Sequence, residues 1–191
     1  MPPGDPTHPA PAVDLEALYR AHAAAIYAWA CLRTNPALRA WVTPEDLAQE
    51  VWVRATRAAP SRDVGSGPVR AWLFTIAKHV LYEVRRLAER SSKEKPSGGS
   101  TTRLLALDQV PATVTSLTQQ LSRDDALQQF LRRVEELDDE DRMLLIHVGL
   151  EAMPQTEAAA RLGLGYEALA KRWQRLRERV RAWPGAIELS A

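Results

Sequence analysis

The feature that most constrains the fold is a polar segment at residues 91–102, SSKEKPSGGSTT, which separates two blocks of helical periodicity. Its Gly, Ser, Pro and Lys content is typical of a flexible linker. Residues 111–122 also lack charge, so we expect the linker to span residues 91–122. Alternation with a period of two is nowhere sustained, which argues against strands. The sequence predicts an all-α fold of two small helical domains, at residues 13–90 and 123–184.

The ends of the chain and its composition exclude several classes of protein. The first eleven residues contain five prolines and no Lys or Arg, so residues 1–12 are expected to be a disordered leader and not a signal peptide. Residues 185–191 form a predicted tail. No segment approaches the roughly 18 apolar residues of a membrane span. A single cysteine, Cys31, permits neither an intramolecular disulfide nor a cysteine-rich zinc site. A cytoplasmic protein without membrane insertion is predicted.

Charge is unevenly distributed, although 25 Lys and Arg residues nearly balance 24 Asp and Glu residues. Residues 70–95 contain seven basic and three acidic side chains, and residues 161–181 contain seven basic and two acidic ones. The segment between them, residues 135–157, carries eight acidic side chains and one arginine. Each predicted domain therefore ends in a basic helix, which is how a chain of near-zero net charge can bind nucleic acid.

A first helical pattern runs from residue 13 to about residue 35, and the second, from residue 44 to about residue 57, has a clear start signal. Thr43 can cap the helix, and Pro44 is tolerated in its first turn. A buried stripe is expected at Leu47, Val51 and Ala55. Beyond this stripe, polar groups flank a large aromatic side chain at Asp46, Gln49, Glu50 and Trp52. This mixture suits a protein interface with an aromatic anchor, although a capped surface helix with a core tryptophan is the simpler interpretation.

The third pattern, residues 69–90, interleaves aromatic and cationic side chains. The aromatic residues are Trp72, Phe74 and Tyr82, and the cationic or titratable ones are Arg70, Lys78, His79, Arg85 and Arg86. Aromatic rings stack on unpaired bases while cations follow the phosphate backbone. An amphipathic core helix with its aromatics inside is an equally good interpretation of the pattern alone.

The C-terminal block contains a helix-turn-helix pattern. Residues 156–162 form the first predicted helix, residues 163–165 a glycine-containing turn, and residues 166–181 a longer basic helix, which in such motifs enters the major groove. An apolar face, expected inside, comprises Leu169, Trp173, Leu176 and Val180. The remaining surface carries Lys171, Arg172, Gln174, Arg175 and Arg179. The alternative is an ordinary bundle helix with a solvated charged face.

Together these blocks resemble one family. The second helix contains DLAQEVWVRA, which resembles the D-L-x-Q-E-x-F core-binding helix of sigma region 2. The third contains AWLFTIAKHVLYEVRR, which resembles the following W-L-x-x-I-A-x-N-x-x-x-D-x-x-R-R segment. A linker and a helix-turn-helix ending in R-x-x-R-x-R, at Arg172, Arg175 and Arg177, complete the order. The layout is similar to that of extracytoplasmic-function (group IV) sigma factors of the sigma-70 family, the two-domain bacterial transcription initiation factors.

The resemblance implies partners and a role for each block. Core RNA polymerase, through the clamp helices of its largest subunit and its flap, would be one partner, and promoter DNA the other. The implied polymerase-binding residues are Asp46, Gln49, Glu50 and Trp52. The implied −10 residues, helped by the loop at 60–68, are Trp72, Lys78, His79, Tyr82, Glu83, Arg85 and Arg86. The implied −35 residues are Tyr166, Glu167, Ala170, Lys171, Arg172, Gln174 and Arg175. Anti-sigma factors regulate many members of the family, and no residue here marks such a site.

Four positions depart from the family pattern. His79 stands where asparagine is usual and Glu83 where aspartate is usual, while Pro154 and Gly165 occupy positions that often hold a capping serine. These departures concern promoter preference more than fold. Because two weak DNA contacts joined by a tether act together only at the correct spacing, which polymerase sets, the free protein is expected to have loosely arranged domains and to bind promoter DNA poorly.

Signals of catalysis are weak. His8, His22, His79 and His147 are scattered, without metal-ligand spacing or a neighbouring carboxylate in sequence. We find no phosphate loop, dinucleotide fingerprint or nucleophile elbow. A non-enzymatic protein without metal or cofactor is predicted. The alternatives to a sigma factor are a helix-turn-helix regulator that acts without polymerase and a sigma-like interaction protein without promoter activity.

Overall fold

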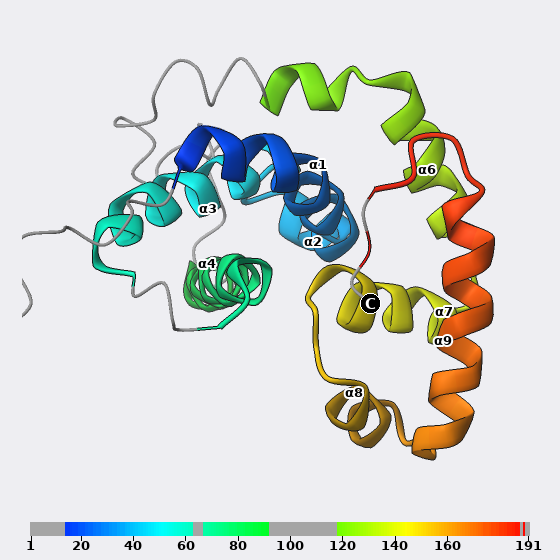
Figure 1. The fold of residues 1–191 in the computed structure, drawn as a ribbon. Helices are drawn as coiled ribbons and strands as arrows, with labels where there is room; N and C mark the ends of the chain where they lie inside the picture. The colour runs from blue at the N-terminus through cyan, green and yellow to red at the C-terminus, as the bar shows by residue number, and fades with distance from the viewer. Residues whose placement is uncertain (1–13, 63–66, 92–117, 188, 190–191) are drawn as a thin grey trace, which may run out of the picture.

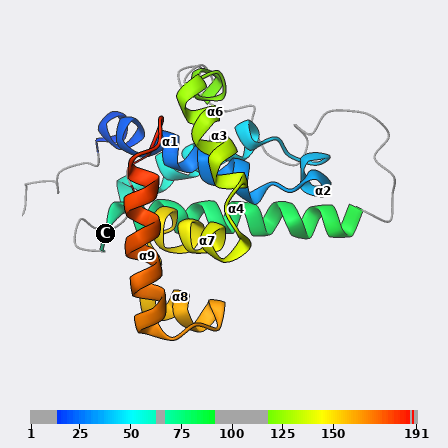
Figure 2. The same ribbon diagram turned by 90° about the vertical axis from the view of Figure 1, so that its right-hand side faces the viewer.

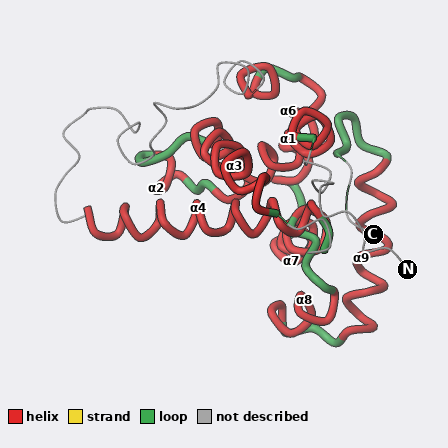
Figure 3. The backbone as a smooth tube through the Cα atoms, turned by 60° about the vertical axis from the view of Figure 1, so that its left-hand side comes forward, coloured by secondary structure: helices red, strands yellow, loops and turns green. Residues whose placement is uncertain are grey.

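The structure is a computed structural model of the 191-residue chain, and it describes residues 14–62, 67–91, 118–187 and 189. Every regular element in these ranges is a helix, which confirms the predicted all-α class (Figure 3). The predicted leader, most of the predicted linker and part of the 60–68 loop lie outside the described residues, so the domain boundaries remain predictions. In the described part of the chain, no helix combines the length and the apolar character that crossing a membrane requires.

The N-terminal domain is built around α3, which packs against both α1 and α4 (Figure 1). Its elements are α1 (Leu15–Arg33), α2 (Pro36–Arg39), α3 (Pro44–Ala58), the 3₁₀ turn η1 (Ala59–Ser61) and α4 (Val69–Ser91). Ile26, Leu47 and Leu73 are fully buried where these helices meet. Trp29 and Phe74 contact each other edge to face, with their ring centroids 6.1 Å apart. Burial of these large apolar side chains holds the three long helices together.

Local capping explains where these helices begin. Thr43 Oγ1 accepts a hydrogen bond from the Asp46 N–H at 3.1 Å, so the predicted cap of α3 is confirmed. Asn35 caps α2 in the same way, through the Leu38 N–H at 2.8 Å. The periodicity of the sequence did not reveal α2, because four residues are too few for an apolar stripe to repeat.

The C-terminal domain places a long helix beside several shorter ones (Figure 2). Its elements are α6 (Asp125–Glu135), α7 (Asp139–Leu144), the π-helical segment η4 (Leu145–Leu150), α8 (Gln155–Leu162) and α9 (Tyr166–Arg181). Contacts join α9 to α7, η4 and α8. Gly149 permits the close approach of α9, because a Cβ atom at this position would lie only 2.8 Å from the Trp173 ring. The described residues therefore contain a helix-turn-helix unit braced by η4.

Glu151 joins the two domains at a buried site. Its Oε1 atom accepts hydrogen bonds from Trp29 Nε1 at 2.8 Å and from the Arg33 guanidinium at 2.5 Å, both on α1. Its Oε2 atom lies 3.0 Å from His147 Nδ1. Arg70 of α4 adds bonds to the carbonyl oxygens of Gly149 and Leu150, each at 3.0 Å. The expectation of loosely arranged domains therefore does not hold in this structure, where they are docked.

Candidate polymerase and nucleic-acid interface

Helix α3 is more deeply buried than its sequence predicts. Leu47, Val51 and Ala55 form the expected buried stripe. Gln49, Glu50 and Trp52, however, are only 8%, 4% and 3% exposed, so the prediction that they extend beyond this stripe is wrong. The reason is that α3 packs on two helices, α1 and α4, and not on one.

Of the four residues implied in polymerase binding, Asp46 alone keeps intermediate exposure. Trp52 instead packs against Tyr19 of α1, with ring centroids 4.7 Å apart. Its position supports the simpler interpretation, a core tryptophan on a capped helix. Among the four implied residues, Asp46, near the first turn of α3, is therefore the one that a partner could reach in this arrangement.

Arg54 connects α3 to α4 through two carboxylates. Its Nε donates to Glu50 at 2.7 Å, and its two terminal nitrogens donate to the two oxygens of Glu83 at 2.8 and 2.7 Å. The hydrogen bond from Arg54 lowers the pKa of Glu83, and the same bond raises the pKa of Arg54. Glu83 is implied as a −10 residue. In this structure both of its carboxylate oxygens accept hydrogen bonds from Arg54 and so hold α4 against α3.

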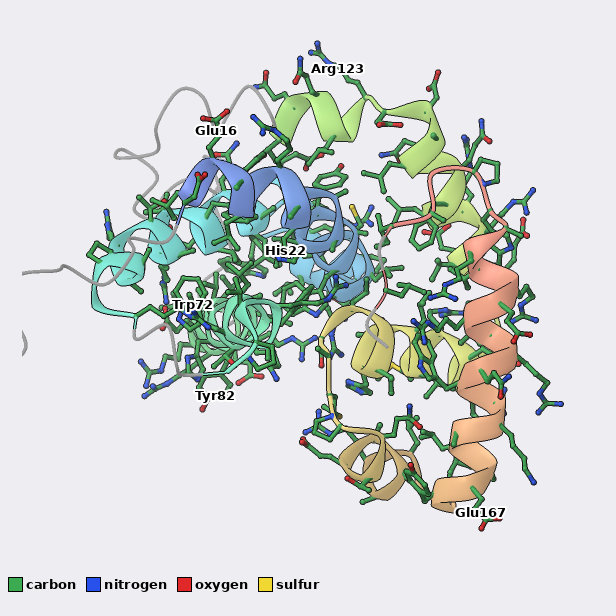
Figure 4. All side chains as sticks on the ribbon, in the orientation of Figure 1. Glu16, His22, Trp72, Tyr82, Arg123 and Glu167 are labelled. Carbon is green, nitrogen blue, oxygen red and sulfur yellow. The ribbon has the colours of Figure 1, made fainter. Side chains whose placement is uncertain are left out.

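Helix α4 divides its aromatic residues between the core and the surface. Phe74 is fully buried, whereas Tyr82 is 65% exposed and points outward from the helix (Figure 4). Trp72 is half-buried, and the guanidinium of Arg62 lies over its ring at 5.4 Å from the centroid. The implied −10 residues left exposed on α4 are His79, Tyr82, Glu83, Arg85 and Arg86, and Lys78 is half-buried. An exposed ring thus lies among exposed cations, as binding to single-stranded nucleic acid requires.

The helix-turn-helix geometry agrees with the predicted pattern. Helix α8 ends at Leu162 and is followed by the cap residue Gly163, whose φ of 68° is left-handed and favours glycine, and α9 begins at Tyr166. The apolar face predicted to lie inside is buried at Leu169, Trp173, Leu176 and Val180. The implied −35 residues on the exposed side are Tyr166, Glu167, Lys171, Gln174 and Arg175, with Ala170 half-buried. Figure 4 shows Glu167 at the outer end of α9.

Arg172 lies differently from its predicted place on the DNA-facing surface. Its guanidinium donates to Asp141 at 2.5 Å, to Asp138 at 2.8 Å and to Glu140. Arg179 also donates to Asp141, at 2.6 Å. The hydrogen bond to Asp141 raises the pKa of Arg172. The acidic segment found in the sequence thus neutralises part of the basic helix, and Arg172 braces α9 against α7.

The sequence did not indicate the four residues of the interdomain site, His147, Glu151, Trp29 and Arg33. The prediction that His147 has no neighbouring carboxylate in sequence is wrong, because Glu151 four residues later lies 3.0 Å from its ring nitrogen. Side chains four residues apart share one face of a helix, so the H-x-x-x-E spacing was the available signal. Trp29 and Arg33, which complete the site from α1, carried no such signal.

The environment of Glu151 lowers its pKa. Burial alone would raise the pKa, but the His147 hydrogen bond, the positive charge of Arg33 and the hydrogen bonds from Trp29 and Arg33 outweigh it. The net result is a pKa lowered from 4.5 to about 2. Glu151 is therefore a carboxylate that its partners hold in the charged state inside the interdomain contact.

The N-terminal helices, in which α3 packs between α1 and a basic α4, lie in a segment whose sequence matches a known family. Residues 18–91, which span most of α1 to the end of α4, match the sequence model of the family described as Sigma-70 region 2. Residues 18–91 are thus similar to sigma-70 region 2, which confirms the predicted resemblance to the sigma-70 family over this segment.

A curated relative indicates a class within this family. The chain is 36% identical over 74 residues to a protein named ECF RNA polymerase sigma factor SigL, from three strains of Mycobacterium tuberculosis. The aligned part is 39% of this chain and 40% of the relative, so the chain spans about two-fifths of the length of the curated relatives it matches. No solved structure matches.

Proposed function

We propose that the protein is an extracytoplasmic-function sigma factor that binds core RNA polymerase and directs promoter-specific initiation. One observation carries the proposal: a segment that matches sigma-70 region 2 and a helix-turn-helix with an exposed basic face occur in one chain. The first unit supplies a surface for polymerase and single-stranded DNA, and the second a helix suited to the major groove. The helix-turn-helix alone would not distinguish a sigma factor from a simple repressor.

In this proposal the protein acts by recognising promoter DNA and capturing one of its strands, without a covalent step. Tyr82 would stack on an unpaired base of the −10 element while Lys78, Arg85 and Arg86 contact phosphates. The exposed side of α9, with Lys171, would read the −35 element. Stacking and phosphate contacts would offset the few kcal/mol that unpairing of each base costs.

Run-off transcription with core polymerase tests the proposal against its two rivals. A sigma factor yields promoter-specific transcripts only when core polymerase and this protein are both present. A polymerase-independent regulator would bind duplex operator tightly as the free protein and yield no transcripts. A sigma-like interaction protein would bind core polymerase without initiating. Absence of transcripts across a promoter library would reject the proposal.

Asp46 is the sharpest probe of the polymerase contact, because replacing the buried Gln49 or Glu50 would also disturb packing. Asp46→Lys is expected to weaken core binding at least tenfold, about 1.4 kcal/mol, by placing a like or unpaired charge against the partner. A fluorescence titration with core polymerase measures this. Thr56→Lys, at an exposed position near the other end of α3, is the control. Equal affinities for both variants and the wild type would remove Asp46 from the interface.

His79 is expected to affect the choice of base at the −10 element. An asparagine amide offers a donor and an acceptor on one planar group, whereas a neutral imidazole offers them on separate ring atoms. Because His79 is exposed on α4, His79→Asn should change the preferred base while transcription continues. Selection from a library of −10 sequences with both proteins measures the change. Identical selections would show that His79 does not read a base.

The exposed cations of α9 are expected to have different roles. Arg175→Ala should weaken binding to all −35 sequences alike and reduce the salt dependence by about one counterion. Lys171→Ala, nearer the start of α9, should change the ranking of −35 variants by about 1–3 kcal/mol at one base pair if its contact to the base is bidentate. Affinities of the full chain bound to core polymerase, across −35 variants at several salt concentrations, separate these effects. A sequence-selective loss from Arg175→Ala would reverse the assignment.

A further inference from the structure

A cavity of about 450 Å³ lies where α4 faces the C-terminal domain. Its α4 side includes Lys78, Tyr82 and Arg85, and its opposite side includes Arg161 and Leu162 of α8. The volume falls within the roughly 300–1,000 Å³ typical of small-molecule sites. Because the two domains each supply one wall, the cavity exists only in the docked arrangement that Glu151 holds together.

The cavity gathers positive charge from both domains. Lys78, Arg85 and Arg161 line it, and no carboxylate does so among the described residues. The nearest acidic partner of Arg161 is Glu157 at 4.0 Å, and both side chains are about half exposed, so this pair is weak. Like charges brought together across an interface repel each other. A bound anion would convert this repulsion into attraction.

The same cavity offers a surface for a flat apolar group. Tyr82 has one of the most exposed large rings among the described residues, at 65%. Met143 and Leu162, both partly buried, lie on the side opposite α4. A ligand that complements both the cationic and the apolar part of the cavity carries an aromatic ring at one end and several negative charges at the other.

We propose that this interdomain cavity binds a free nucleoside polyphosphate. The base would stack on Tyr82, and the phosphates would lie among Lys78, Arg85 and Arg161. A single nucleotide suits the volume, whereas a DNA strand would have to continue past the wall formed by α8. The site shares its α4 residues with the proposed −10 surface, so a bound nucleotide would compete with promoter DNA. The nucleotide site does not depend on the proposed sigma activity, since Arg161 lies outside every surface assigned to that activity.

Calorimetric titration of the full chain, without polymerase or DNA, tests the proposal with ATP, inorganic tripolyphosphate and adenosine. ATP should bind about tenfold more tightly than tripolyphosphate, and adenosine should not bind measurably. Arg161→Ser should weaken ATP binding about tenfold, whereas Arg181→Ser, which changes another exposed arginine outside the cavity, should leave it unchanged. Tyr82→Ala should abolish the advantage of ATP over tripolyphosphate. Both mutated side chains of the cavity are at least half exposed, and circular dichroism checks that the variants fold.

Three results would overturn the proposal. They are ATP binding that is absent, ATP binding equal in wild type and Arg161→Ser, or an equal loss in Arg181→Ser. A single-stranded oligonucleotide that binds more tightly than ATP, with no dependence on Arg161, would assign the α4 residues to DNA alone. Because the titration contains no polymerase or promoter, its failure leaves the proposed sigma activity intact, and failed run-off transcription would leave the nucleotide site intact.

Discussion

Glu151→Ala is expected to lower the free energy of unfolding by about 3–5 kcal/mol, the range for removing one partner of a buried ion pair. The Glu151 side chain is fully buried, and that of Arg33 is only 16% exposed. Without the carboxylate, Arg33 loses its counter-charge, and the indole N–H of Trp29 and the ring of His147 lose their hydrogen-bond partner. Their desolvation would then remain uncompensated.

Urea unfolding followed by circular dichroism measures this loss. Glu16→Ala is the matched control, because its ion pair with Arg20 has side chains that are 82% and 76% exposed and should contribute little. A loss below about 1 kcal/mol for Glu151→Ala would contradict the view that the interdomain contact depends on this carboxylate.

The same carboxylate should make domain docking sensitive to acid. The pKa of Glu151 is about 2 when folded and 4.5 ordinarily, so its stabilising contribution is fully present above about pH 4.5. The contribution is lost as pH falls toward 2, because the unfolded chain binds the proton more readily. In Glu151→Gln this part of the pH dependence should be missing, which a comparison of urea midpoints across that range would reveal.

Trp173→Ala is expected to cost about 3–5 kcal/mol, the range for truncating a buried aromatic side chain. The indole is 2% exposed and rests against Gly149, where no Cβ intervenes. The cavity left behind would lie between α9 and η4, so the helix-turn-helix unit should loosen first. Thermal and urea unfolding measure the loss. Tyr166→Ala, an exposed aromatic at the start of the same helix, should change stability by less than about 0.5 kcal/mol. Similar effects for the two variants would mean that α9 is rotated relative to this structure.

Much of the secondary structure follows from local chemistry and was predictable. The start of α3 at Pro44 follows from the Thr43 cap, and the limits of α9 at Tyr166 and Arg181 coincide with those predicted. The inward face of α9 was also predicted correctly. Caps and apolar stripes act over three or four residues, so one segment contains the whole signal. The region 2 motifs were recognisable for the same reason, since they lie within α3 and α4.

The partners of each polar side chain depended on tertiary structure. Periodicity shows which face of α3 is apolar, but whether one or two helices cover it decides the burial of Gln49 and Glu50. The basic composition of α9 does not show that Arg172 meets three carboxylates more than thirty positions earlier. Trp29 and Glu151, 122 positions apart, bond only because the domains dock. Local patterns encode helices and their faces, whereas contacts between distant residues arise only when the faces assemble into one fold.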